Sequence, residues 1–259
     1  MAICRVAVGE IAPELSPGSQ AWTDLIRDLE RLQPDLFVLN ELPFGPWLAA
    51  RPGYDRDAWR ACVAAHEQGV AAVHELGVPT VLGSRAVDLD GRRCNQGFIW
   101  RHAAGLEAIH TKQHLPRSPG YWETSWTEPG RQRFQLSQAG PLRVGMLICT
   151  DIMFNEHARQ YGRDGVDLIV VPRATPPLVS HQFEVALQMT AIVSGCYVAS
   201  SDRRGTDSAG EAFAGRGCII NPIGQTVAAT SFFSRVAVHD IDTDFVRGQQ
   251  QRYPCNVID

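Results

Sequence analysis

The chain has 259 residues, with 24 basic and 28 acidic side chains and a formal net charge of −4. This charge excludes a general nucleic-acid binder, which needs a basic surface, and no apolar run in the sequence reaches the ~18 residues that span a bilayer. Hydrophobic residues make up 44% and charged residues 20% of the chain, which is typical of a globular protein with a large core.

The first part of the chain alternates apolar segments with segments of helical periodicity. In order, we predict a strand at residues 4–8, a helix capped by Ser19 and ended by Pro34, a strand at 35–39, a helix at 57–76 and a strand at 78–83. Such repeated strand–helix units indicate parallel strands in a sheet.

The pattern then changes to short strands with fewer helices. We predict a hairpin at 97–101 and 106–110, a long loop at 115–130, a strand at 142–148, a helix at 154–161, a strand at 168–171, a helix at 178–194, and strands at 197–201, 217–221, 226–229 and 236–241. Strands of both kinds favour an α/β protein with mixed sheets. Because no linker or repeat interrupts the chain, we expect one domain over residues 1–259.

The seven cysteines show no close pair that would indicate a thiolate zinc site. His110 and His114 lie four residues apart, but the segment lacks the glutamate of a helical zinc motif. We therefore expect no metal and no cofactor. The N-terminus has no basic segment ahead of a long apolar stretch, so we expect no signal peptide and a cytoplasmic location.

Three reactive side chains follow predicted buried strands. They are Glu41, Lys112 and Cys149. Each has an ordinary structural explanation when taken alone: a surface carboxylate, a solvated lysine and a packed thiol. Together they form a set in which a carboxylate takes the thiol proton, a thiolate attacks and an ammonium stabilises the oxyanion.

Lys112 is also the single lysine of the chain, beside 23 arginines. Arginine is a planar fork that stays charged, whereas lysine is a compact point charge. A position that keeps lysine in such a composition is either chance or a place where arginine does not fit.

At these residues the sequence resembles the carbon–nitrogen hydrolase (nitrilase) superfamily, in particular its amidases. The stretches that carry the resemblance are LNELPF at 39–44, HTKQHLP at 110–116 and GMLICTDIMF at 145–154, with support from 165–172 and 213–224. The resemblance covers nearly the whole chain.

The resemblance implies a four-layer αββα sandwich, in which two mixed sheets pack face to face with helices outside. It implies that Glu41 is the general base, Lys112 the oxyanion-stabilising residue and Cys149 the nucleophile. Many members carry a second glutamate in the loop after the lysine, and Glu123 has the matching spacing, whereas Glu128 directly precedes a proline. The family also suggests a homodimer or larger homo-oligomer.

The function that follows is a thiol amidohydrolase acting on a small-molecule amide through a Cys149 acyl-enzyme, with the backbone N–H of Thr150 as a second oxyanion donor. A nitrile hydrolase, an N-carbamoyl-amine hydrolase and a non-catalytic binding subunit remain alternatives. Tyr121, Trp122 and Trp126 lie in the loop beside Glu123, and they either line the substrate pocket or pack in the core or at an interface.

Three departures from the family pattern bear on specificity. Thr150 and Asp151 stand where many nitrile-hydrolysing members have Trp-Glu, which favours an amidase. Arg173 follows a strand-end proline where a small residue is common, and it is either a cation for an anionic substrate group or part of a structural ion pair. Residues 190–195 lack the usual helix pattern, which affects local packing or an interface contact.

Overall fold

The structure is a computed structural model that describes residues 3–257. Its strands are β1 (Ile3–Ile11), β2 (Leu36–Val38), β3 (Thr80–Leu89), β4 (Arg92–Arg101), β5 (Gly105–Thr111), β6 (Leu136–Ala139), β7 (Leu142–Met146), β8 (Leu168–Arg173), β9 (Tyr197–Thr206), β10 (Ala212–Ala214), β11 (Cys218–Ile220), β12 (Thr226–Ala229) and β13 (Val236–Asp242). Its helices are α1 (Gln20–Leu32), α2 (Arg56–Ala71), α3 (Glu123–Trp126), α4 (Asn155–Arg163), α5 (Ser180–Ser194) and α6 (Thr243–Gln250).

The strands form two mixed sheets that are joined by a short pairing between β1 and β9. The first sheet has the order β13-β1-β2-β3-β4-β5, and β1, β2 and β3 are parallel. The second has the order β6-β7-β8-β9-β11-β12, and β7, β8 and β9 are parallel. A short parallel pairing of Glu10 with Asp202 and Ile11 with Arg203 joins them. The predicted sandwich of two mixed sheets is thus confirmed, and the sheets are continuous at this corner.

Alternating side chains of the strands build the layers. In β1, Val6 and Val8 point into the core between the sheets, together with Val144 and Leu168 of the second sheet, whereas Ala7 points the opposite way. Ala7 packs with residues of α1, including Trp22. This alternation is what a strand between two apolar layers requires.

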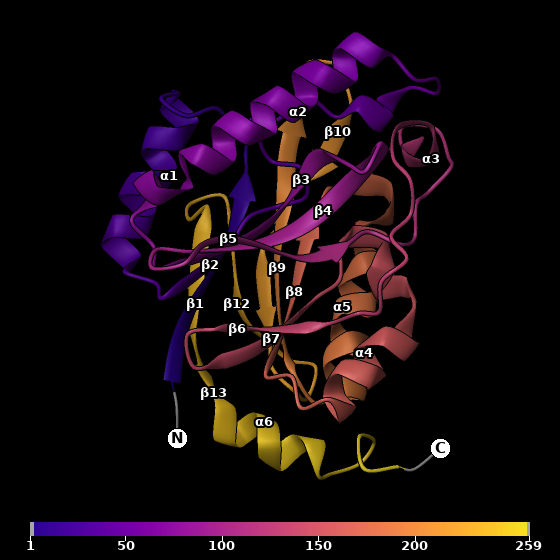
Figure 1. Ribbon diagram of the computed structural model, residues 1–259. Helices are drawn as coiled ribbons and strands as arrows, with labels where there is room; N and C mark the ends of the chain where they lie inside the picture. Colours follow the sequence, from indigo (N-terminus) through magenta and orange to yellow (C-terminus); the bar gives the residue numbers. More distant parts are fainter. Residues whose placement is uncertain (1–2, 258–259) are drawn as a thin grey trace.

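Helices cover both outer faces of the sandwich (Figure 1). The helices α1 and α2 contact the first sheet, and α5 contacts β9 of the second and packs against α4. Ser19 caps α1 as predicted, since its hydroxyl accepts a hydrogen bond from the Trp22 N–H at 3.2 Å. The arrangement is therefore the four-layer αββα order that the sequence motifs implied.

Element boundaries differ from the predictions where the helical pattern is locally broken. The predicted helix at 57–76 is α2 followed by a separate 3-10 turn at Val73–Leu76. The predicted loop at 115–130 contains the short helix α3. The strands β6 and β10 and the helix α6 were not predicted, because each is too short to show a clear period.

The prediction of one domain over residues 1–259 stays a prediction, and its first two and last two residues lie outside the described part. The continuous sheet supports it. Among residues 3–257, no helix has the length and apolar character that crossing a membrane requires.

Candidate active site

The three reactive side chains reach one place from strand ends in both sheets. Glu41 lies just beyond β2, Lys112 directly after β5 and Cys149 just beyond β7. The Glu41 N–H donates to the Arg173 carbonyl at the end of β8, at 3.2 Å, so backbone from the two sheets meets here. All three side chains are buried, at 0%, 0% and 3% exposure.

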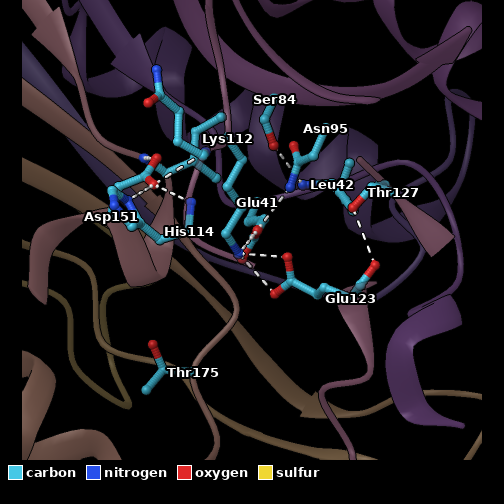
Figure 2. A network of polar contacts seen from close by, with 12 residues as sticks. Glu41, Leu42, Ser84, Asn95, Lys112, His114, Glu123, Thr127, Asp151 and Thr175 are labelled. Atoms are coloured by element: carbon cyan, nitrogen blue, oxygen red, sulfur yellow. Dashed lines mark hydrogen bonds and ion pairs between the residues drawn. The ribbon is translucent and has the colours of Figure 1, made fainter. Parts of the chain in front are cut away.

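Two carboxylates converge on the Lys112 ammonium, as Figure 2 shows. Lys112 Nζ lies 2.7 Å from Glu41 Oε1 and 2.7 Å from each carboxylate oxygen of Glu123. Burial acts to lower the pKa of Lys112, but Glu123, Glu41 and Cys149 outweigh it and raise this pKa above its usual value. The ammonium is therefore held charged although Lys112 is fully buried.

Glu41 has one oxygen engaged and one free. Oε1 accepts hydrogen bonds from Lys112 and, at 2.8 Å, from Asn95 Nδ2. Oε2 is buried and has no hydrogen-bond partner among the described residues. A buried carboxylate oxygen without a donor is costly, and it is the atom of Glu41 that can accept a proton.

Cys149 begins the 3-10 turn Cys149–Met153 in a left-handed backbone conformation, with φ of +47°. This region is unusual for a residue other than glycine, and such strain often accompanies function. Burial, followed by the charge of Glu41, raises the pKa of the Cys149 thiol well above its usual value, against the opposing effect of Lys112. The resting group is thus a thiol, and a base must remove its proton before it can attack.

Asp151 connects the lysine segment to the cysteine turn. Its Oδ2 accepts from His110 Nε2 at 2.8 Å and from the Ile148 N–H at 3.1 Å, and its Oδ1 accepts from His114 Nδ1 at 2.8 Å. Burial would raise the pKa of Asp151, but the hydrogen bonds from the two histidines hold it well below its usual range. One buried carboxylate therefore fixes the backbone on either side of Lys112 relative to Cys149.

A mainly apolar cavity of about 400 Å³ opens on Cys149. This volume lies within the range of small-molecule sites. The cavity is lined by Pro116, Ser118, Pro119, Tyr121, Cys149, Thr150, Met153, Ala174, Pro176, Leu178, Val179, Phe183 and Glu211. Glu41, Lys112 and Glu123 are absent from this lining, but all three lie within electrostatic reach of Cys149.

The structure separates the residues predicted to bind substrate. Thr150 lines the cavity, whereas Trp122 is absent from its lining and its neighbour Tyr121 is present. Arg173 is 2% exposed, and its guanidinium lies 3.3 Å from Asp202 Oδ2. Arg173 Nε also donates to Ser200 Oγ at 2.7 Å. Of the two alternatives for Arg173, these are the contacts of a structural ion pair.

Sequence reasoning missed three residues of this site. Asn95 lies in β4, and its contact with Glu41 depends on how β4 pairs within the sheet. Asp151 was noted only as a departure from a family pattern, although two histidines flank Lys112. Glu211 follows the β9–β10 turn and had no motif around it. In each case the missing information is a contact between distant segments.

The sequence and the fold are similar to those of known proteins. A deaminated glutathione amidase from Escherichia coli is 25% identical over 177 residues, which cover 68% of this chain and 65% of that protein. An omega-amidase from Danio rerio is 26% identical over 189 residues, which cover 70% of this chain and 67% of that protein. The crystal structure of a carbon–nitrogen hydrolase from Helicobacter pylori superposes with a TM-score of 0.84 at 18% identity, covering 98% of this chain and 94% of that one.

Residues 2–251 also match the model of one family, described as carbon-nitrogen hydrolase. The match covers nearly all of the chain and confirms the resemblance that the three sequence motifs indicated. The chain therefore belongs to the carbon–nitrogen hydrolase family.

Proposed function

We propose that this enzyme hydrolyses the C–N bond of a small carboxamide to an acid and ammonia or an amine, through an acyl-enzyme on Cys149. The observation that carries the proposal is the free Oε2 of Glu41 in the buried Glu41–Lys112–Glu123 cluster within electrostatic reach of Cys149. The amidase names of two relatives support the reaction class. Replacement of Trp-Glu by Thr150 and Asp151 favours an amide over a nitrile substrate.

In the first half-reaction, Glu41 Oε2 takes the proton of the Cys149 thiol. The sulfur electron pair forms a bond to the amide carbon, and the carbonyl π pair moves to oxygen. An ammonium has three N–H donors. One directed at Glu41 and one shared by the Glu123 oxygens leave the third for this oxyanion, which the Thr150 N–H also meets.

Collapse of the tetrahedral intermediate completes acylation. The oxygen pair re-forms the carbonyl, the C–N bond breaks, and the leaving nitrogen receives the proton that Glu41 holds. The product is a thioester on Cys149. One side chain thus acts first as the general base and then as the general acid, as is common in such sites.

Water completes the second half-reaction. Glu41 accepts a proton from water, and the resulting hydroxide oxygen attacks the thioester carbon. The C–S bond then breaks, and the Cys149 sulfur recovers the proton from Glu41. Glu123 keeps Lys112 charged and in place throughout, because its carboxylate compensates the buried ammonium when Glu41 is protonated.

A panel of small carboxamides and matched nitriles tests this proposal, with ammonia release as the measurement. We expect turnover of amides, loss of turnover in Cys149→Ala, and an acyl adduct on Cys149 by intact mass after rapid quenching. Cys255→Ala is the matched control, because Cys255 is a free thiol on the partly exposed C-terminal segment. Turnover of nitriles alone, or of amides in Cys149→Ala, would contradict the proposal.

We propose two further properties that the sequence suggested. The first is a cytoplasmic location, which seven free cysteines support. The second is assembly as a homodimer or larger homo-oligomer, which light scattering over a range of concentrations would test. A monomer at all concentrations would contradict it.

A further inference from the structure

The cavity that reaches Cys149 carries a charge that the proposed chemistry does not use. Most of its lining side chains are apolar, and among the described residues that line it Glu211 alone brings a formal charge. Within the described chain, no hydrogen bond or ion pair compensates this carboxylate. A single carboxylate in an apolar cavity biases which molecules enter it.

Glu211 is held in place by its own turn. Asp207 Oδ1 accepts the backbone N–H of Ala209 at 3.0 Å and that of Glu211 at 2.9 Å. The Asp207 N–H in turn donates to the Glu211 carbonyl at 3.0 Å. The backbone of Glu211 is therefore fixed, and its side chain is presented from a rigid turn.

The loop that carries Tyr121 packs against Glu211. Gly120 approaches Glu211 so closely that a Cβ at this position would lie 3.0 Å from Glu211 Oε2. Trp47 fixes the loop, because its Nε1 donates to the Gly120 carbonyl at 2.9 Å and its ring packs 5.4 Å from that of Tyr121. Glu211 and Tyr121 thus lie on two segments that meet at the cavity.

Tyr121 has a polar group without a partner. Its hydroxyl is buried and makes no hydrogen bond within the described residues. Burying a hydroxyl without a partner is costly, so a buried, unpaired hydroxyl on a residue that lines a cavity suits a group that bonds to a ligand. Tyr121 also lies within electrostatic reach of both Cys149 and Glu211.

Three arginines near the site have contacts outside the cavity. Arg173 pairs with Asp202, and Arg216 pairs with Glu184 at 2.6 Å. Arg203 is buried and donates to the backbone carbonyls of Leu42 and Gly45. None of these arginines lines the cavity. The cavity therefore offers a substrate a negative charge and a hydroxyl.

We propose that Glu211 and Tyr121 bind the non-reacting end of the substrate, and that this end carries a cation. The substrate class is a carboxamide with an apolar chain and a terminal ammonium or guanidinium group. The amide carbon lies at Cys149, the chain contacts the apolar wall, and the cation pairs with Glu211 and donates to the Tyr121 oxygen. The inference rests on the proposed amidase function and adds the specificity of the same site.

Three series of amides with equal chain lengths test this inference. One series carries a terminal ammonium, one a terminal methyl and one a terminal carboxylate, and kcat/KM is measured for each. Because charge-assisted hydrogen bonds contribute about 1.5–3 kcal/mol, we expect the best ammonium amide to exceed its methyl counterpart by about 10- to 100-fold. The carboxylate amides should be the poorest substrates.

Variants then assign the selectivity to residues. In Glu211→Gln the ratio of ammonium to methyl amide should fall by about 10-fold or more, and the carboxylate amides should improve. Tyr121→Phe should lower kcat/KM for ammonium amides and keep the order of the three series, because the charge remains. Glu30→Gln, the same change on an exposed face of α1, is the control and should keep the wild-type ratio.

The outcomes separate the two proposals. If no amide is hydrolysed, the proposed function fails. If amides are hydrolysed but the wild-type enzyme prefers carboxylate or methyl ends, the specificity inference alone is wrong, and this comparison needs no variant. An ammonium preference that survives in Glu211→Gln, with an unfolding midpoint close to wild type, also overturns the role of Glu211.

Discussion

The exchange of Lys112 for arginine separates charge from shape in the active site. Lys112 is fully buried, and its Nζ lies 2.7 Å from three carboxylate oxygens. Arginine keeps the charge, but its planar guanidinium is larger than the ammonium and points its donors in fixed directions. It therefore displaces Glu41 or Glu123 and does not present an N–H at the same oxyanion position.

The expected magnitude follows from these contacts. Because the two carboxylates stay compensated, the cost in stability is that of overpacking, about 1–3 kcal/mol, within the ~5–15 kcal/mol of a typical domain. Loss of one oxyanion donor lowers kcat by about 10²–10³, and displacement of Glu41 adds to that loss. We expect kcat/KM for the best amide to fall by about 10³ or more.

Steady-state kinetics with urea unfolding on the same preparations measures both effects. Arg131→Lys, the reverse exchange at an exposed position, is the control and should resemble wild type. Lys112→Met is the comparison in which the carboxylates lose their partner, and it should cost about 3–5 kcal/mol of stability. A folded Lys112→Arg enzyme with more than a tenth of wild-type kcat/KM would refute the requirement for an ammonium.

Three further predictions concern groups around the site. Asp151→Asn replaces a carboxylate oxygen by an NH₂ donor, which then faces the N–H donor of either His110 or His114. Because about 1–3 kcal/mol of hydrogen bonding is lost, kcat should fall about 10- to 100-fold. An unchanged kcat with an unchanged unfolding midpoint would contradict the connecting role of Asp151. Arg173→Ala leaves Asp202 buried and unpaired, so it should lower the free energy of unfolding by about 3–5 kcal/mol. Activity on acidic and neutral amides should fall equally. A selective loss of activity on acidic amides would instead support Arg173 as a cation that binds the substrate. His66 is fully buried, and burial lowers its pKa to about 4, so the folded state favours the neutral ring. Above pH 6.5 the ring is neutral in both the folded and the unfolded state. As the pH falls from 6.5 toward 4, the unfolded state gains a proton first, and the free energy of unfolding should fall by about 3 kcal/mol. Urea midpoints at pH 7, 5 and 4 should therefore fall more steeply for wild type than for His66→Gln, and equal slopes would contradict this account.

Local pattern in the sequence predicted most of the regular elements. Ser19 is a good N-cap residue, and Trp22, Leu25 and Leu29 repeat at helical spacing, so α1 appears where expected. The strand β2 was expected because its residues are all apolar. Failures occurred where the local pattern is weak: the break after Ala71 has no proline to mark it, and α3 is one turn long.

The residues of the candidate site also fall into those that local sequence predicted and those that only the structure revealed. Glu41, Lys112 and Cys149 each follow a buried strand, and their motifs are local, so the sequence was enough to predict them. Glu123 was predicted because its position matches the second glutamate of the family that the sequence resembles, and its hydrogen bond to Lys112 is consistent with that choice. Trp122 and Tyr121 are neighbours in the chain, and only the path of the loop decides which of them lines the cavity.

The sequence by itself thus indicated the candidate residues for the reaction, because the thiol, the ammonium and one carboxylate follow buried strands and the second carboxylate matches a motif of the family. The tertiary structure decided what surrounds them. Asn95 reaches Glu41, Asp202 holds Arg173, and Glu211 meets Tyr121 through contacts between segments far apart in the chain. Such contacts depend on how the two sheets meet, and periodicity along the chain does not indicate which distant segments come into contact.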